Sequence, residues 1–190
     1  WDLKGRMWVL EMYDYPSGLH DNNTPGGRVV ILESTRHDGH YDKRTVFVDH
    51  LPYPQGLMCW RNGVLICAAP NILYAADDDH DDRPDSVKTL FSGFSPDNQQ
   101  WEVNGLAWGL DNWVYGASSI HNDPIKVGET ERTADLGGRD FRMSPDTLAF
   151  EPAAGRTQFC RVRDDWGNWF GNDNSNSLWN YPLEDRYIRA

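Results

Sequence analysis

The chain has 190 residues, of which 39% are hydrophobic and 25% charged, so a compact core is expected and a disordered or fibrous protein is excluded. Its net charge of −11, with no basic stripe anywhere along the sequence, makes nucleic acid and anionic membrane surfaces poor partners. No run of about 18 apolar residues is present, so no membrane span is predicted.

The ends of the chain indicate a piece of a longer product. It begins with Trp1 in place of an initiator methionine, carries no signal peptide, and stops at residues 187–190 without an evident cap or turn. We therefore expect a fragment or a processed protein.

Short β-rich runs between turn signals dominate the sequence, and the main body has no convincing 3.6-residue periodicity. The dipeptide Asn62-Gly63 predicts a two-residue hairpin turn. In chain order, strands are expected at residues 7–12, 29–33, 45–49, 63–68, 72–76, 87–91, 113–117, 140–143, 148–151 and 168–171.

The three cysteines form no CxxC pair, and their odd number excludes a complete disulfide framework. We expect Cys59, Cys67 and Cys160 to be small buried apolar groups. Cys59 and Cys67 flank the predicted turn, so they could face each other, although nothing requires a bridge.

An internal repeat connects the predicted strands. The apolar run at residues 29–31 recurs at 72–74, and Asp42 recurs as Asp85, both 43 positions further on. Gly56 recurs 49 positions on as Gly105, which indicates an insertion of six residues in the second copy. A weaker echo follows about 56 positions on, where Asn168-Trp169 repeats Asn112-Trp113.

Repeats of this length, built from four short strands, are typical of propeller blades. We therefore predict an all-β fold: a partial β-propeller of the six-bladed type with about three blades. Residues 1–190 are expected to be a single partial propeller domain, with blade ends near 20, 70, 120 and 175. A β-sandwich is the structural alternative.

An acidic run follows one predicted strand with the spacing of a calcium loop. Asp77, Asp79, Asp81 and Asp85 occupy relative positions 1, 3, 5 and 9, and the Arg83 carbonyl can add a further oxygen. Oxygen ligands of this kind suit Ca²⁺. The alternative is a solvated acidic hairpin tip that binds no metal.

Two departures weaken the calcium interpretation. Asp82 stands where such loops usually carry a turn glycine, and Lys88 stands where a bidentate glutamate usually closes the loop. The copy of this loop 43 residues earlier keeps a glycine, Gly39, but has Ser34 and Arg36 at the first two ligand positions. We expect no calcium there.

Two polar loops are the best candidates for a ligand-facing surface, at residues 98–104 and 172–177. Their amides and the indole rings of Trp101 and Trp179 offer hydrogen bonds and apolar faces suited to a sugar. The alternative is that the amides cap turns in their own backbone. The candidate ligand-binding residues are Gln99, Gln100, Trp101, Asn104, Asn172 and Asn174.

Four stretches together resemble one known family over nearly the whole chain. They are RMWVLEMYDYP at residues 6–16, NGLAWGLDNWVYG at 104–116, GRDFR at 138–142 and DDWGNWFGNDNSN at 164–176. The sequence resembles the N-terminal propeller of the planctomycete-type membrane-bound dehydrogenases, which are related to soluble quinoprotein glucose and sorbosone dehydrogenases.

The resemblance implies a six-bladed propeller exported to the periplasm or the extracellular space. It also implies oxidation of a sugar or related alcohol by pyrroloquinoline quinone, with a cytochrome c-type electron acceptor in the full-length protein. In the quinoprotein relatives a histidine removes the hydroxyl proton, and Trp101 occupies that position here. Indole has no basic nitrogen, so the nearest titratable substitute is Glu102, which faces the opposite side if the segment is extended.

Two hypotheses for the function follow. The chain is part of an exported quinoprotein-like dehydrogenase propeller acting on a sugar or related alcohol, or it is a non-catalytic, calcium-stabilised propeller that binds carbohydrate or protein. The letters of a catalytic triad at Ser118, Ser119, His121 and Asp123 lie close together in sequence only, and we interpret them as a loop. No catalytic residue is assigned.

Overall fold

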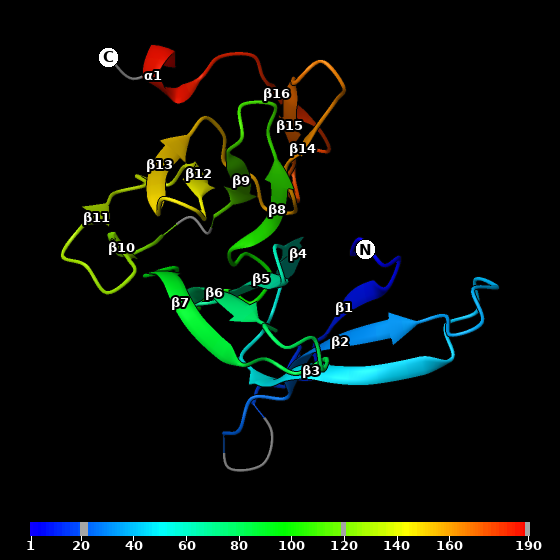
Figure 1. Cartoon of the computed structure of the whole chain (residues 1–190). Helices are drawn as coiled ribbons and strands as arrows, with labels where there is room; N and C mark the ends of the chain where they lie inside the picture. Colours follow the sequence, from blue (N-terminus) through cyan, green and yellow to red (C-terminus); the bar gives the residue numbers. More distant parts are fainter. Residues whose placement is uncertain (20–22, 119–120, 189–190) are drawn as a thin grey trace. The chain divides into compact units, whose positions relative to one another are not determined.

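The computed structural model describes residues 1–19, 23–118 and 121–188. Over these ranges the chain is all-β, with short antiparallel strands and one single-turn helix, α1 (Asp185–Ile188) (Figure 1). The strands are β1 (Met7–Glu11), β2 (Gly27–Glu33), β3 (Lys43–Leu51), β4 (Gly56–Trp60), β5 (Gly63–Ala68), β6 (Asn71–Ala76), β7 (Ser86–Ser92), β8 (Asn104–Trp108), β9 (Val114–Ala117), β10 (Ile125–Val127), β11 (Thr133–Ala134), β12 (Asp140–Ser144), β13 (Ala149–Ala153), β14 (Val162–Arg163), β15 (Trp169–Gly171) and β16 (Trp179–Tyr181).

The described part of the chain contains no helix with the length and apolar composition needed to cross a membrane. The chain divides into two compact units, one formed by Trp1–Ala68 with Leu73–Lys88, and the other by Ala69–Ile72 with Thr89–Ala190.

The first unit contains two antiparallel meanders. In one, β1, β2 and β3 follow each other in sequence order, with register irregularities in β2 between Gly27 and Val30. In the other, β4 to β7 are neighbours in chain order, and the residues of β6 at 71–72 and of β7 at 89–92 belong to the second unit. Side chains from both meanders, including Trp8, Phe47 and Ile66, form one buried cluster. Because one face of each sheet is apolar, burying that face stabilises the pairing.

The second unit continues the same pattern. The strands β8, β9, β12 and β13 form a four-stranded antiparallel sheet, and β14, β15 and β16 form a three-stranded one. The end of β7 pairs with β10, which pairs with β11. Phe94, Phe141 and Phe150 pack together with ring centroids 5.2–6.2 Å apart, and this aromatic core fixes the sheet that carries the candidate site.

The expected all-β fold is confirmed, and every strand expected from the sequence is present with shifts of a few residues at the ends. No sheet closes on itself within the described ranges. The expected blade ends near 20 and 120 fall outside the described residues. Those near 70 and 175 fall in the loops that follow β5 and β15.

The structure of the β4–β5 hairpin corrects the predicted position of its turn. Trp60 pairs with Gly63, so the two-residue turn is Arg61-Asn62 rather than Asn62-Gly63, and Arg61 takes a positive φ of 52°. Gly63 is needed for space, because a Cβ there would lie 1.9 Å from the Ala75 carbonyl oxygen.

The cysteines differ from one another in burial. Cys67 is buried as expected, whereas Cys160 is exposed. Cys67 is the partner of Gly56 and Cys59 is the partner of Val64, so the two cysteines of the hairpin do not face each other.

The 43-residue repeat is visible in matching hydrogen bonds. The Asp42 N–H donates to the Glu33 carbonyl at 3.0 Å, and the Asp85 N–H donates to the Ala76 carbonyl at 2.8 Å. Each of these aspartates then accepts an N–H from seven residues earlier, at 2.9 Å in the first copy and 2.6 Å in the second. The two loops are therefore structural copies, each closing a β-hairpin.

Candidate functional site

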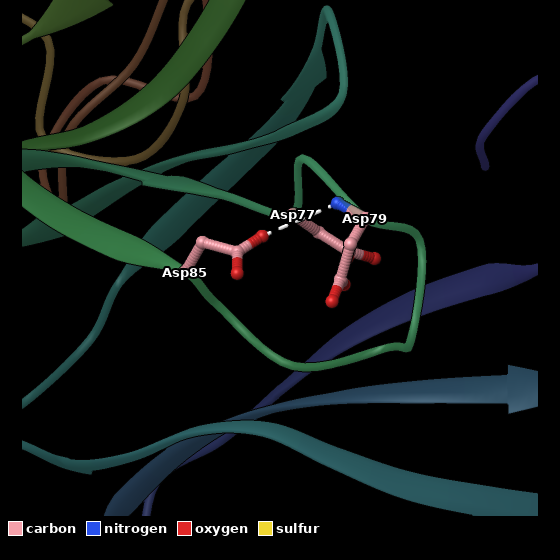
Figure 2. A group of neighbouring side chains, drawn as sticks. All are labelled: Asp77, Asp79 and Asp85. Carbon is pink, nitrogen blue, oxygen red and sulfur yellow. Dashed lines mark hydrogen bonds between the residues drawn. The ribbon is translucent and has the colours of Figure 1, made fainter.

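The acidic loop between β6 and β7 gathers three of its four predicted metal ligands. Carboxylate oxygens of Asp77, Asp79 and Asp85 lie within 4.8 Å of one another, and Figure 2 shows the three side chains on the loop between β6 and β7. Asp77 is buried, and the other two are exposed. The carboxylate of Asp81, the fourth predicted ligand, is not part of this group.

Backbone N–H groups of the same loop orient these carboxylates. Asp85 Oδ2 accepts from the N–H of Asp78 at 2.6 Å and of Asp79 at 3.3 Å. Asp77 Oδ1 accepts from the N–H of Asp81 at 3.1 Å. The loop is therefore held in shape by its own acidic side chains, and an oxygen-preferring cation such as Ca²⁺ suits the remaining lone pairs.

Asp82 replaces the expected glycine without changing the turn. Its φ is 67°, while the φ of Gly39 at the equivalent place in the earlier loop is 81°. The Asp82 carboxylate binds the Arg6 guanidinium and lies 3.6 Å from Lys43 Nζ. These contacts accompany a backbone conformation that aspartate tolerates better than most residues.

The two predicted ligand loops are brought together through Gln158, which is 2% exposed. Its Nε2 donates to the Gln100 carbonyl at 3.3 Å, and its Oε1 accepts the Asn174 N–H at 3.1 Å. Its own N–H donates to the Asn172 carbonyl at 2.8 Å. Gln158 thus fixes both loops by backbone contacts, and the sequence had not indicated it.

Asn104, which was predicted to face a ligand, is buried and hydrogen-bonds to the backbone of the segments around Glu102 and Gln158. Its Nδ2 donates to the carbonyls of Glu102 and Gln158, both at 2.8 Å, and its Oδ1 accepts the Cys160 N–H at 2.7 Å. These are contacts with backbone groups, of the kind that the alternative interpretation of the amides describes. Asn172 Oδ1, by contrast, is buried without a hydrogen-bond partner in the described part of the chain.

The segment around Trp101 is a turn and not an extended strand. The Trp101 N–H donates to the Asn98 carbonyl at 2.7 Å, and β8 begins only at Asn104. The expectation for Glu102, which assumed an extended segment, is therefore wrong in its premise. The Trp101 indole Nε1 donates to the Ser118 carbonyl at 3.1 Å, which ties the turn to the end of β9.

Glu102 is fully buried, and neither carboxylate oxygen has a hydrogen-bond partner among the described residues. Burial raises the pKa of Glu102 to about 8. The carboxyl group is therefore mostly protonated and uncharged at pH 7.

A pocket of about 840 Å³ lies in the second unit, beside these loops. Its lining includes the rings of Trp179 and Tyr181 together with the polar side chains of Asn180, His121 and Arg156. Arg156 also lies over the Trp101 ring, with its guanidinium carbon 5.5 Å from the centroid. Trp179 therefore lines the pocket, and Trp101 contacts Arg156, which also lines it.

Gln99 and Gln100 do not line this pocket, and neither do Asn172 and Asn174. Gln100 and Asn174 are exposed, whereas Gln99 and Asn172 are half-buried. Of the residues named beforehand, the pocket lining therefore contains only Trp179 and His121.

Of the triad letters, Ser119 lies outside the described residues. Ser118 Oγ accepts a hydrogen bond from Asn122 Nδ2 at 2.6 Å. His121 is exposed and lines the pocket, so the lining includes an imidazole ring.

A buried ion pair lies close to the pocket. Arg161 Nη1 lies 3.1 Å from Asp140 Oδ2, and the two side chains are 2% and 0% exposed. Asp140 also accepts hydrogen bonds from the N–H and the hydroxyl of Thr157, and that hydroxyl lies 3.0 Å from Tyr181 Oη. Burial raises the pKa of Asp140 to about 6, although Arg161 and Thr157 act in the opposite direction.

Comparison with curated proteins finds no match, and comparison with solved structures finds none either. A protein-family comparison does match, over residues 1–190, to the family described as Domain of unknown function (DUF7133). The chain belongs to this family.

Proposed function

We propose that the chain is the substrate-holding part of an exported, quinoprotein-like propeller dehydrogenase that acts on a sugar or related alcohol. The observation that carries the proposal is the pocket of about 840 Å³, whose lining includes the aromatic residues Trp179 and Tyr181 and the amide residue Asn180. Asn180 Nδ2 donates to the Trp169 carbonyl at 3.2 Å, and its Oδ1 can accept a hydrogen bond from a ligand hydroxyl. Aromatic faces beside planar hydrogen-bonding groups match the apolar C–H face and the hydroxyl groups of a sugar.

The succession of antiparallel meanders supports the propeller part of the proposal. The strands β8, β9, β12 and β13 form a four-stranded sheet in the order expected of a blade, and β4–β7 are four successive neighbours within a six-stranded sheet that β10 and β11 extend. On this proposal, β1–β3 and β14–β16 belong to two further blades.

The residues of the pocket do not fit pyrroloquinoline quinone itself. The quinone is a tricarboxylate, but the pocket's Arg139 is already paired with Asp185, and Asp135 also lines the pocket. These carboxylates offset the cations that such an anion requires. In this proposal the quinone, and the contact with a cytochrome c-type electron acceptor, belong to parts of the protein outside residues 1–190.

The dehydrogenase proposal also needs a group that accepts the hydroxyl proton. Trp101 has no basic nitrogen, and Glu102 is buried and does not line the pocket. His121 lines the pocket, and a neutral imidazole has a ring nitrogen that can accept a proton. We assign the role of base to His121 within this proposal.

The test is dye reduction by a protein that contains this chain and the further blades, supplied with pyrroloquinoline quinone and Ca²⁺, across a panel of sugars and polyols. We expect reduction with at least one of them. Trp179→Ala should raise KM, and His121→Gln should lower kcat by about 100-fold or more. Demonstrated quinone binding without reduction of any substrate would sink the enzyme proposal.

The position of Trp101 favours a second candidate function, a non-catalytic propeller that binds carbohydrate or protein and is stabilised by calcium. Its indole N–H is bonded to the Ser118 carbonyl, so the residue at the relatives' base position has a structural contact here. Sugar binding without dye reduction in the same experiment would identify this function.

Calcium belongs to both candidates. We propose that Asp77, Asp79 and Asp85 hold Ca²⁺ and thereby stiffen the β6–β7 hairpin, with the Arg83 carbonyl and water as further ligands. Asp81 is left out of the ligand set because its carboxylate is not in the group.

A further inference from the structure

The outer edge of β3 is a feature of the first unit that neither the pocket nor the acidic loop uses. β3 has nine residues, more than any other strand of the described part, and it is an outermost strand of the β1-β2-β3 sheet (Figure 1). Among the described residues, no strand pairs with its outer side. Backbone N–H and C=O groups on the open side of an edge strand are available to a further strand.

The internal repeat shows that the fold accommodates a further strand at this edge. β7 is the counterpart of β3, 43 positions further on, and β10 pairs with its outer side. The paired residues of β7 are Phe91 and Ser92, which correspond to Val48 and Asp49 of β3. The edge that is occupied in the second copy of the repeat is therefore open in the first.

Three exposed side chains of β3 share one face of the sheet. Arg44 and Val46 lie opposite positions 32 and 30 of β2, and Asp49 Oδ1 accepts a hydrogen bond from Arg28 Nε at 2.8 Å. Positions 28, 30 and 32 alternate along a strand, so they point to the same face. The register irregularity beside Val46 makes Phe47 the extra residue of a bulge, which brings Val46 and Asp49 to one face although they are three positions apart.

These three side chains form a self-complementary pattern. When two β3 strands pair antiparallel about Val46, with Phe47 again as the extra residue, Arg44 of one copy lies opposite Asp49 of the other. A two-fold axis repeats this contact, and opposite charges directly across two strands stabilise their pairing. Val46 is 37% exposed, and the side chains of Arg44 and Asp49 are 43% and 36% exposed, so a second copy can reach all three.

The ion pairs already present on this face extend the match. Arg44 lies 2.6 Å from Glu11, and Asp49 lies 2.8 Å from Arg28. Pairing with a second copy therefore gives, on each side of the axis, a row of four charges of alternating sign. The net charge of −11 opposes association, but at about 0.15 M salt charges more than about 8 Å apart are largely screened, so the local pattern decides.

We propose that the open edge of β3 binds the same edge of a second copy of this chain, in an antiparallel two-fold dimer centred on Val46. The two β1-β2-β3 sheets then form one continuous sheet across the dimer. The association needs neither a sugar nor Ca²⁺, so it goes beyond the proposed function and is tested separately from it.

Sedimentation equilibrium of the wild-type chain over a range of concentrations, at about 0.15 M salt, tests the proposal. We expect a monomer–dimer equilibrium. Val46→Lys combined with Asp49→Lys places like charges opposite each other at all three central positions, and it should raise the Kd of the dimer by about tenfold or more. A wild type that stays monomeric up to about 1 mM would overturn the proposal, as would a variant that dimerises like the wild type.

The matched control is Val87→Lys combined with Asp123→Lys, which makes the same change of charge at exposed positions outside β3. It should dimerise like the wild type, and an equal loss of dimer in the control would show a general effect of charge. If the β3 variant does not fold, hydrogen exchange of the wild type still decides. The amides of residues 43–51 should exchange more slowly as the protein concentration rises, and exchange independent of concentration would contradict pairing at this edge.

Discussion

Individual buried side chains in the second unit carry chemistry that their positions in the sequence do not reveal. Glu102 lies in a polar run beside Gln100 and Trp101, yet it is fully buried and its carboxylate has no hydrogen-bond partner in the described part of the chain. Arg161 is buried against Asp140, which follows Arg139 in a run of charged residues. Burial of a charged or titratable side chain depends on contacts between distant segments, so the local pattern cannot predict it.

Glu102 should make stability depend on pH. Because its pKa is raised from 4.5 to about 8 by burial, the folded state binds more protons than the unfolded state between these values. The free energy of unfolding should therefore fall as pH rises from about 4.5 to about 8 and then level off, by a total on the order of 4 kcal/mol from this group. Urea unfolding at several pH values measures this.

The matched variants are Glu102→Gln, which keeps the shape and cannot ionise, and Glu131→Gln at an exposed position. We expect Glu102→Gln to be more stable than the wild type at pH 8.5. Its free energy of unfolding should also fall much less than that of the wild type as pH rises from about 4.5 to about 8. Glu131→Gln should keep the wild-type pH profile. A wild-type profile in Glu102→Gln would show that the buried carboxyl is not the cause.

At the scale of elements, two copies of one hairpin loop differ mainly in their acidic side chains. The loops that end at Asp42 and Asp85 share their backbone hydrogen bonds and their positive-φ positions, but only the second gathers three carboxylates. Calcium binding should therefore be confined to the second loop, and the first serves as an internal control.

Calorimetric titration with Ca²⁺ tests this difference. Asp79→Ala combined with Asp85→Ala removes two ligands and should weaken binding by at least about 100-fold, because the remaining oxygens cannot fill the coordination shell. Asp42→Asn changes the equivalent position of the first loop and should leave the affinity for Ca²⁺ unchanged. Equal heats for the wild type and the double variant would remove the metal assignment.

The strands with alternating or β-branched runs, such as β2 and β5, could be predicted from sequence, whereas others could not. The strand β4 has a half-buried pattern without alternation, and β10, β11, β14 and β16 contain only two or three residues each, too few for a period to show. Composition and spacing named Trp179, which lines the larger pocket, and Asp77, which lies in the acidic cluster, as candidates. The roles of Gln158 and Arg161 depend on partners up to 58 positions away, and no local signal marks them.

At the scale of the whole molecule, the proposed substrate pocket lies in the second unit and the proposed calcium loop lies in the first. The acidic loop lies within Leu73–Lys88, and every lining residue of the pocket lies within Thr89–Ala190. The acidic net charge of −11 suits a neutral polyhydroxylated ligand better than an anionic one. Sugar binding can therefore be tested without added metal.

The most direct test of the proposed function is a titration of the chain with glucose, galactose and sorbitol, followed by calorimetry, for the wild type, Trp179→Ala and Trp166→Ala. Trp179 lines the pocket of about 840 Å³, whereas Trp166 is 83% exposed and does not line it. We expect binding of at least one ligand, with an affinity about tenfold or more weaker in Trp179→Ala and unchanged in Trp166→Ala. Binding that survives in Trp179→Ala, or no binding of any of the three ligands, would contradict it.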